Sequence, residues 1–284
     1  GPSWQWLRDA ARSGRSFQLC GGIEGFHGVT RGFWAKIEYD GTDFVGFQIQ
    51  AQGRTGQGEI ERALEKVTRK ATRVTGAGRT DRGVHARGQV VGFNTEWRHG
   101  VSDLWRALNA VLAADVAIVA LDLAPEGFHP RFDATSRTYR YTVLNLPDRS
   151  PLARRTAWQV GHELDLHQMI HASRSLVGTH DFSAFGRPPQ GTNTVRTVKR
   201  AAWQEKWPFL TFDIEANAFL YRMVRSIVGM LVLLGAGQIS IEEFEALLQD
   251  RDRSQIRQVA PAQGLCLMRV DYSTRSAGVR QQGV

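Results

Sequence analysis

The sequence predicts an α+β fold of two similar halves, each a mixed or antiparallel sheet with helices packed on one side. Three observations support this prediction. A length of 284 residues suits one large or two medium domains. Strand-like and helix-like segments recur in both halves, without the strict alternation of a parallel sheet. The segment 145–151, with Pro147 and Pro151, is the expected crossing between the halves.

Four parts are therefore expected along the chain. Residues 31–146 form the N-terminal half and residues 147–273 the C-terminal half. Residues 1–30 have poor apolar periodicity and begin with Gly-Pro, so we expect an accessory extension or a remnant of tag cleavage. Residues 274–284 have almost no apolar side chains and are expected to form a flexible tail.

The N-terminal half begins with alternating residues that predict a strand and continues into a helix. This helix is expected because Ile60, Leu64 and Val67 recur at the spacing of one helix face. The elements expected in this half are a strand at 33–39, a turn at 40–43, a helix at 58–71, a strand at 89–93, a helix capped by Ser102, and strands at 116–123 and 138–144.

The C-terminal half repeats the mixture of strands and helices. Its expected elements are a helix at 164–176, strands at 195–203 and 209–215, helices at 218–235 and 241–248, and a strand at 265–271. Arg225 lies on the otherwise apolar helix at 218–235. Because an unpaired buried charge is costly, we expect a carboxylate to pair with it.

Composition limits the function. With 42% hydrophobic and 23% charged residues, the chain has enough apolar surface to fold, which excludes a disordered protein. The longest apolar run without charge, residues 226–240, is shorter than the roughly 18 residues of a membrane span. Two cysteines, Cys20 and Cys266, make no disulfide framework, and no secretory signal opens the chain, so a cytoplasmic location is expected. A net charge of +8 favours a polyanionic partner.

The densest polar cluster is Gly-Ala-Gly-Arg-Thr-Asp-Arg-Gly-Val-His-Ala at residues 76–86. It lacks the third glycine of a dinucleotide-binding motif and the Gly-Lys-Ser/Thr of a phosphate loop. What remains is a carboxylate, Asp81, between Arg79 and Arg82. Neighbouring cations are expected to lower its pKa, which suits a nucleophile or base. An exposed salt bridge is the alternative interpretation of the same residues.

The cluster resembles the catalytic loop of the TruA-type tRNA pseudouridine synthases, in which Gly-Arg-Thr-Asp is followed by Gly-Val-His. Further similar segments follow in the order of that family, from about residue 33 to 272. They are Glu-Tyr-Asp-Gly at 38–41, Gly-Phe-Gln at 46–48, Leu-Asn-Ala at 108–110, Phe-His-Pro-Arg-Phe at 128–132, Ser-Arg-Thr-Tyr-Arg-Tyr at 136–141, Gly-Thr-His-Asp-Phe at 178–182, Asn-Ala-Phe at 217–219 and Met-Val-Arg at 223–225. The resemblance implies the pseudouridine synthase fold with a central RNA-binding cleft and a catalytic N-terminal half.

The resemblance also implies roles for single residues. Asp81 matches the catalytic aspartate, and Arg79 matches the arginine that helps to displace the target nucleotide from its stem. Tyr139 matches the tyrosine that stacks on the extruded uracil, and Arg225 matches the basic partner of the carboxylate. His85 is expected to order the loop.

Three residues depart from the family pattern. Phe47 replaces a tryptophan, and Gly56 replaces a common valine; both are expected to affect packing. Arg82 replaces an alanine beside the nucleophile, and we expect it to affect how RNA is held.

The implied reaction moves uracil from an N1–C1′ to a C5–C1′ bond without net gain or loss of atoms or electrons. No cofactor and no metal is therefore expected. The nucleophile can act at C1′ of the ribose or at C6 of the base, and the residues favour neither route. The base must first leave its stack, which requires a displacing side chain and a stacking surface. His167 and His171 share a helix face but lack the H-E-x-x-H order of a zinc site.

The expected function is thus a tRNA isomerase that converts uridines 38, 39 and 40 of the anticodon arm. By resemblance it is a homodimer that grips each tRNA across both subunits. One alternative is a non-catalytic RNA-binding or chaperone protein on the same fold. A second is a hydrolase that uses Asp81 on a nucleoside or phosphate ester.

Overall fold

The computed structural model describes residues 30–273. The expected tail at 274–284 and the expected extension at 1–30, apart from Thr30, lie outside the described residues. The predicted α+β fold is confirmed, because helices and strands of the described chain alternate irregularly. None of the helices within residues 30–273 combines the length and apolar character needed to cross a membrane.

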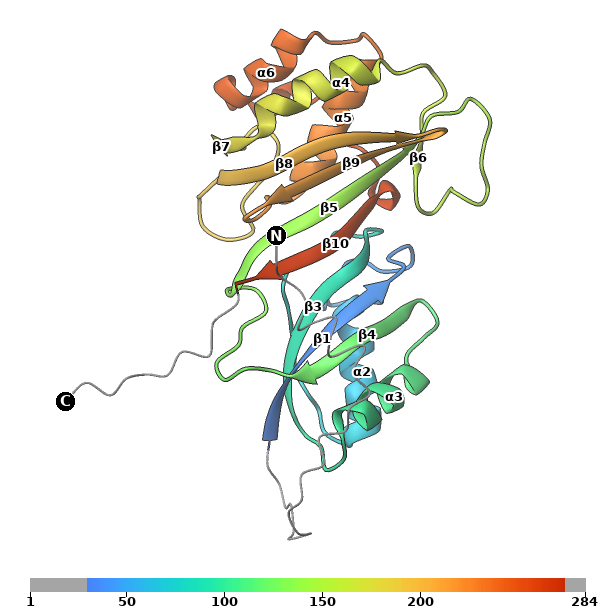
Figure 1. Ribbon diagram of the computed structural model, residues 1–284, viewed down its shortest axis with the longest axis vertical. Helices are drawn as coiled ribbons and strands as arrows, with labels where there is room; N and C mark the ends of the chain where they lie inside the picture. Colours follow the sequence, from blue (N-terminus) through green and yellow to red (C-terminus); the bar gives the residue numbers. More distant parts are fainter. Residues whose placement is uncertain (1–29, 274–284) are drawn as a thin grey trace, which may run out of the picture.

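Ten strands of the described chain form one sheet (Figure 1). They are β1 (Thr30–Tyr39), β2 (Val74–Gly76), β3 (His85–Glu96), β4 (Val116–Leu123), β5 (Ala134–Leu144), β6 (Trp158–Gln159), β7 (Gly178–Asp181), β8 (Val195–Lys206), β9 (Phe209–Ala216) and β10 (Leu265–Tyr272). Their order is β4-β1-β3-β10-β5-β9-β8-β7, with β2 beside β3 and β6 beside β5. The sheet is mixed, because β10–β3 and β5–β6 are parallel and the other pairs are antiparallel.

The helices form two groups, one for each half, and Figure 1 shows α2 and α5 behind the sheet. They are α2 (Gly56–Thr68), α3 (Val101–Val111), α4 (Leu166–Ser173), α5 (Met223–Gly235) and α6 (Ile241–Asp250), with 3-10 turns η1 (Arg174–Leu176), η2 (Arg253–Gln255) and η3 (Ala262–Gly264). In α2, Ile60 and Leu64 are fully buried, as their helical spacing predicts.

Two predicted helix starts are wrong. Helix α3 begins at Val101 after Gly100, so Ser102 is not its cap; the Asp103 carboxylate instead accepts the N–H of Gly100 at 3.2 Å. Helix α5 begins at Met223, not at residue 218, because the residue before it has left-handed backbone with φ 65°. Both starts depend on contacts that apolar spacing does not encode.

Strand β10 joins the two halves of the molecule. It lies between β3 and β5, with Leu267 paired to Ala86 on one side and to Tyr139 on the other. The backbones approach closely at Gly88, where a Cβ would lie 2.3 Å from the Met268 carbonyl oxygen. A single sheet therefore crosses the boundary expected between residues 146 and 147, and it brings the loop before β3 next to β5.

Candidate active site

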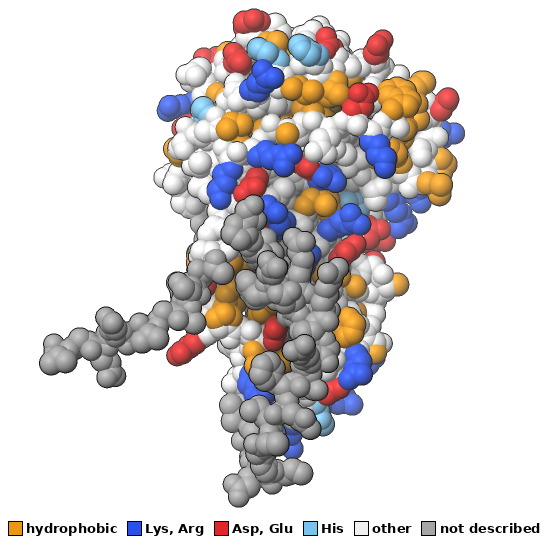
Figure 2. Space-filling view, viewed as in Figure 1, with side chains coloured by type: hydrophobic (Ala, Val, Ile, Leu, Met, Phe, Trp, Pro, Cys, Tyr) orange, Lys and Arg blue, Asp and Glu red, His pale blue; other side chains and the backbone are white. Residues whose placement is uncertain are grey.

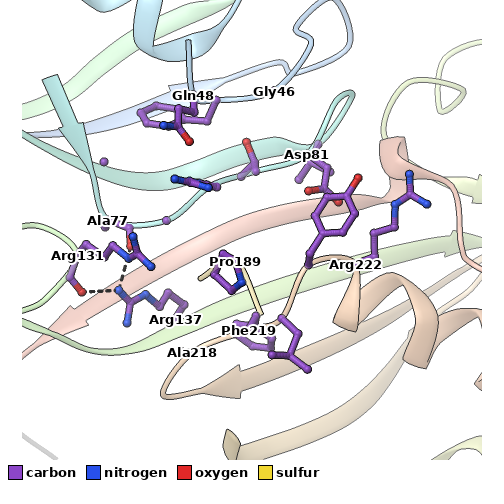
Figure 3. A pocket seen from close by; sticks show the side chains of 18 of the residues that line it. Gly46, Gln48, Ala77, Asp81, Arg131, Arg137, Pro189, Ala218, Phe219 and Arg222 are labelled. Carbon is purple, nitrogen blue, oxygen red and sulfur yellow. Dashed lines mark hydrogen bonds between the residues drawn. The ribbon is translucent and has the colours of Figure 1, made fainter. Parts of the chain in front are cut away.

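A cleft of about 880 Å³ lies between the two halves of the described chain, and residues of both halves line it. Its lining comes from the loop that carries Asp81, from residues 45–50, from residues around His129 and strand β5, and from the residues that lead into α5. Figure 3 shows Asp81 and Arg222 at one end of the cleft and Arg137 at the other.

The loop that carries Asp81 is fixed against the turn around Phe47. The Phe47 N–H donates to the Thr80 carbonyl at 3.1 Å, and Gly46 forms a short antiparallel bridge with Asp81. Gly83 follows with φ 77°, a left-handed conformation that glycine adopts without steric cost. These contacts hold the backbone of Asp81 in one position.

The Phe47 ring lies against two glycines, one of which, Gly56, also departs from the pattern that the resemblance implies. A Cβ at Gly56 would lie 3.0 Å from this ring, and a Cβ at Gly76 would lie 2.3 Å from it. Phe47 thus occupies the space that a valine at position 56 would need. The two departures are in contact with each other, beside the loop that carries Asp81.

Burial dominates the electrostatics of Asp81. Loss of water raises the pKa of its carboxyl above the ordinary value, and the positive charges of Arg225 and then Arg222 oppose this shift. The low pKa predicted from Arg79 and Arg82 is therefore wrong in direction. The cations that act on Asp81 come from the start of α5 and not from its own loop.

Arg225 lies behind Asp81, on the first turn of α5. Its Nη1 is 3.5 Å from the Asp81 Oδ2, and both side chains are largely buried. Its Nε donates to the Ala260 carbonyl at 2.7 Å, and the Ala260 N–H donates back to the Arg225 carbonyl at 2.9 Å. The guanidinium is thereby oriented toward the carboxylate, which is the partner that the buried charge requires.

Tyr139 lies on β5 and lines the cleft with Asp81. The ring is buried and meets Phe219 edge to face, with the ring centroids 5.0 Å apart. Burial, and then the negative charge of Asp81, raises the pKa of the Tyr139 phenol. The phenol is therefore protonated at neutral pH and presents a fixed aromatic surface.

The other predicted site residues lie in different places. Arg79 and Arg82 are exposed and line the cleft. His85 is buried outside the lining: its Nδ1 accepts the Gly41 N–H at 3.1 Å, and its Nε2 donates to the Arg155 carbonyl at 2.7 Å. His85 therefore links three segments, and its position supports the expected role of ordering the loop.

Sequence reasoning missed Arg137 as a site residue. Its guanidinium lies in the cleft lining and donates to four carbonyl oxygens, of Ala77, Arg131, Ala134 and Asn217, at 2.7 to 3.3 Å. Figure 3 shows the hydrogen bonds to Ala77 and Arg131. Burial lowers its pKa. The available signal was the period of two, which places Arg137 and Tyr139 on the same face of one strand.

Charge separates the cleft from the rest of the surface. Asp81 is the only carboxylate in the lining, which carries seven arginines among the described residues. They are Arg79, Arg82, Arg131, Arg137, Arg187, Arg196 and Arg222. Over β5, β8 and β9, by contrast, Lys and Arg lie among Asp and Glu (Figure 2). There Arg140 pairs with Asp213 at 2.7 Å, for example. The unpaired arginines make the cleft suited to a polyanion.

No metal centre is evident within residues 30–273. No group of three or more His, Cys, Asp or Glu side chains in that part of the chain is placed to hold a metal ion. His167 and His171 have no third ligand there.

Comparison with known proteins agrees with this geometry. The family described as tRNA pseudouridine synthase matches residues 35–133 and 172–273. A tRNA pseudouridine synthase A of Roseiflexus sp. (strain RS-1) is 45% identical over 251 residues, which cover 87% of this chain and 93% of that protein. One of Geobacter sp. (strain M21) is 43% identical, over 83% of this chain and 96% of that protein. The chain belongs to the tRNA pseudouridine synthase family.

Proposed function

We propose that the chain converts uridine to pseudouridine at positions 38, 39 and 40 of the tRNA anticodon arm, with Asp81 as nucleophile. The observation that carries this proposal is the cleft itself. Among the described lining residues one carboxylate faces seven arginines, which favours a nucleic-acid substrate and one covalent nucleophile.

The reaction needs only the residues at hand. Asp81 attacks C1′ of the ribose or C6 of the base, the N1–C1′ bond breaks, and the uracil turns. A C5–C1′ bond then forms, the covalent bond to Asp81 breaks and returns its carboxylate, and the C5 proton leaves to water. Burial strips water from the Asp81 carboxylate, while Arg225 at 3.5 Å favours its ionised form.

The uridine must leave its helix before Asp81 can reach it, at a cost of a few kcal/mol. Arg79 is exposed in the cleft and is suited to fill the space that the base leaves. Tyr139, held by Phe219, is suited to stack on the extruded uracil; such stacking is worth roughly 1–3 kcal/mol. Arg82, also exposed in the cleft, then contacts the RNA backbone.

We further propose a homodimer in the cytoplasm, with each tRNA held across both subunits. The resemblance to TruA-type enzymes supports this arrangement. Size-exclusion chromatography with light scattering, with and without tRNA, measures the mass of the particle. A mass near 32 kDa in the absence of tRNA would contradict the homodimer.

The first test maps pseudouridine at single-nucleotide resolution in an unmodified tRNA transcript incubated without metal or cofactor. We expect modification in the anticodon arm by the wild type. Asp81→Asn should bind the transcript but lose activity by on the order of 10³-fold or more. Asp43→Asn, which changes an exposed carboxylate outside the lining, is the matched control and should remain active.

Other outcomes identify the alternatives. Binding without modification by the wild type would favour the RNA chaperone. Release of free uracil or of phosphate would favour the hydrolase.

A further inference from the structure

One wall of the cleft is built from two backbone segments in close contact. The Tyr221 N–H donates to the Arg187 carbonyl at 2.8 Å, and the two residues form an isolated antiparallel bridge. At Gly186 a Cβ would lie 2.7 Å from both the Leu220 Cβ and the Tyr221 carbonyl oxygen. This wall therefore holds Arg187 and Arg222 at fixed places in the cleft lining.

The backbone at Arg222 is itself unusual. Its φ is 65°, a left-handed conformation that a long side chain seldom adopts. The conformation ends the extended segment, begins α5, and sets the guanidinium over the Tyr221 ring at 5.1 Å from the centroid. The side chain is thus directed by the fold and not by an acidic partner.

A third arginine completes a group of like charges. Burial lowers the pKa of Arg253, on the turn η2, and the positive charges of Arg187 and then Arg222 lower it further. Its Nη1 is buried and has no hydrogen-bond partner. No described carboxylate forms an ion pair with any of the three. Two residues earlier, Arg251 does pair with Asp181, at 3.6 Å.

Three gathered guanidiniums with an unused buried donor match the requirements of a bound phosphate, which accepts several charge-assisted hydrogen bonds. Arg187 and Arg222 line the same cleft as Asp81. A phosphate there belongs to a nucleotide within reach of Asp81.

We propose that Arg187, Arg222 and Arg253 form a phosphate site that binds an RNA backbone phosphate beside the flipped uridine. The proposal rests on the proposed function, because it assumes that a uridine is presented to Asp81. It adds the residues that bind the backbone of that nucleotide.

The test measures tRNA affinity over a range of salt concentrations for Arg187→Gln, Arg222→Gln and Arg253→Gln. Each should weaken binding about 3- to 10-fold and lower the slope of log K against log salt, by at most the roughly 0.7 to 0.9 of one phosphate contact because two cations of the site remain. Arg253→Lys, which keeps the charge, should retain most of the slope. Arg251→Gln is the matched control and should change neither quantity.

A neutral methylphosphonate at each phosphate around the target uridine identifies the contact. At one of these phosphates the methylphosphonate should lower the affinity of the wild type for tRNA. The same methylphosphonate should not lower the affinity of Arg222→Gln any further, because that variant has already lost the contact. Thermal melting of each variant reports folding, so that a loss of affinity is counted only in a folded protein. If the folded variants match Arg251→Gln, or if Arg253→Lys behaves as Arg253→Gln does, the phosphate site is refuted.

The two proposals fail in different ways. Wild-type conversion of uridine together with unchanged salt slopes in the variants would refute the phosphate site alone. Tight tRNA binding by the wild type without conversion would refute the proposed function.

Discussion

At the scale of single residues, burial and charge act on Asp81 in opposite directions. Burial wins, so its pKa lies above the ordinary value although Arg225 and Arg222 favour the ionised form. A desolvated carboxylate is a better nucleophile, but because its pKa is raised a smaller fraction of it is ionised at low pH. On acidification the active site is therefore expected to lose activity at a higher pH than a site with an exposed aspartate would.

This balance predicts the effect of Arg225→Gln. The variant removes the largest favourable charge, so the pKa of Asp81 should rise further. Because the ionised form reacts, the acidic limb of kcat/KM against pH should move to higher pH. Arg222→Gln should move it less, since Arg222 ranks second among the opposing causes. The measurement is single-turnover pseudouridine formation across pH; an unmoved limb in Arg225→Gln would contradict this account.

Much of the site was predictable from the sequence. The resemblance implied that Asp81, Arg79 and Tyr139 share one site, and all three line the cleft. The cost of a buried charge predicted the carboxylate partner of Arg225. The pKa direction was not predictable, because burial is a property of the assembled cleft. The sequence shows Arg79 and Arg82 beside Asp81, but it does not show the burial of Asp81, which outweighs the effect of nearby positive charges on its pKa.

At the scale of elements, helix α5 positions the cations of the site. Its first turn carries Arg225, and the segment 258–260 packs along it so closely that Gly229 has no room for a side chain. A Cβ there would lie 2.2 Å from the Gln258 carbonyl oxygen. The same segment supplies the Ala260 carbonyl that orients Arg225. Packing of one helix and the position of one guanidinium are thus coupled.

Gly229→Ala should therefore lower both stability and activity. The added methyl must push the 258–260 segment away, at about 1–3 kcal/mol of unfolding free energy. Gly161→Ala is the control, because its Cβ would meet its nearest atom at an ordinary 3.5 Å. Urea unfolding and single-turnover rates measure the two effects. Equal stability of the two variants would argue against the close packing.

The start of α5 and the short strands show which element boundaries a sequence pattern does not predict. Apolar spacing predicted a helix over 218–235, but the backbone of Tyr221 pairs with Arg187, far away in sequence. The helix can start only after that pairing ends, at Met223. Strands β2, β6 and β7, none longer than four residues, were also not predicted, because their pairing partners define them.

At the scale of the whole molecule, charge is sorted by surface. None of the seven arginines of the cleft lining forms an ion pair with a described carboxylate, whereas Arg140 on β5 and Lys199 on β8, outside the lining, pair with Asp213 and Glu215. Unpaired cations remain available to phosphates, and paired cations contribute little to binding.

This sorting predicts a steep salt dependence of tRNA affinity. With several phosphates neutralised in the cleft, log K should fall linearly with log salt, by roughly 0.7 to 0.9 for each contact. Arg140→Gln, which removes a paired cation, should leave the slope unchanged. Filter binding at a series of salt concentrations gives both slopes. A flat dependence for the wild type would count against an RNA substrate.

The central place of β10 has a consequence for biosynthesis. This strand is the last element of the described chain, yet it lies in the middle of the sheet. Its neighbours are β3, which follows the loop of Asp81, and β5, which carries Tyr139. The ribosome synthesises Asp81 early, but the sheet under the cleft lacks its central strand until residues 265–272 emerge. We expect ribosome-arrested chains that stop before Leu265 to be cleaved readily by protease and to leave tRNA unmodified. Catalytic competence would thus arrive only late in translation.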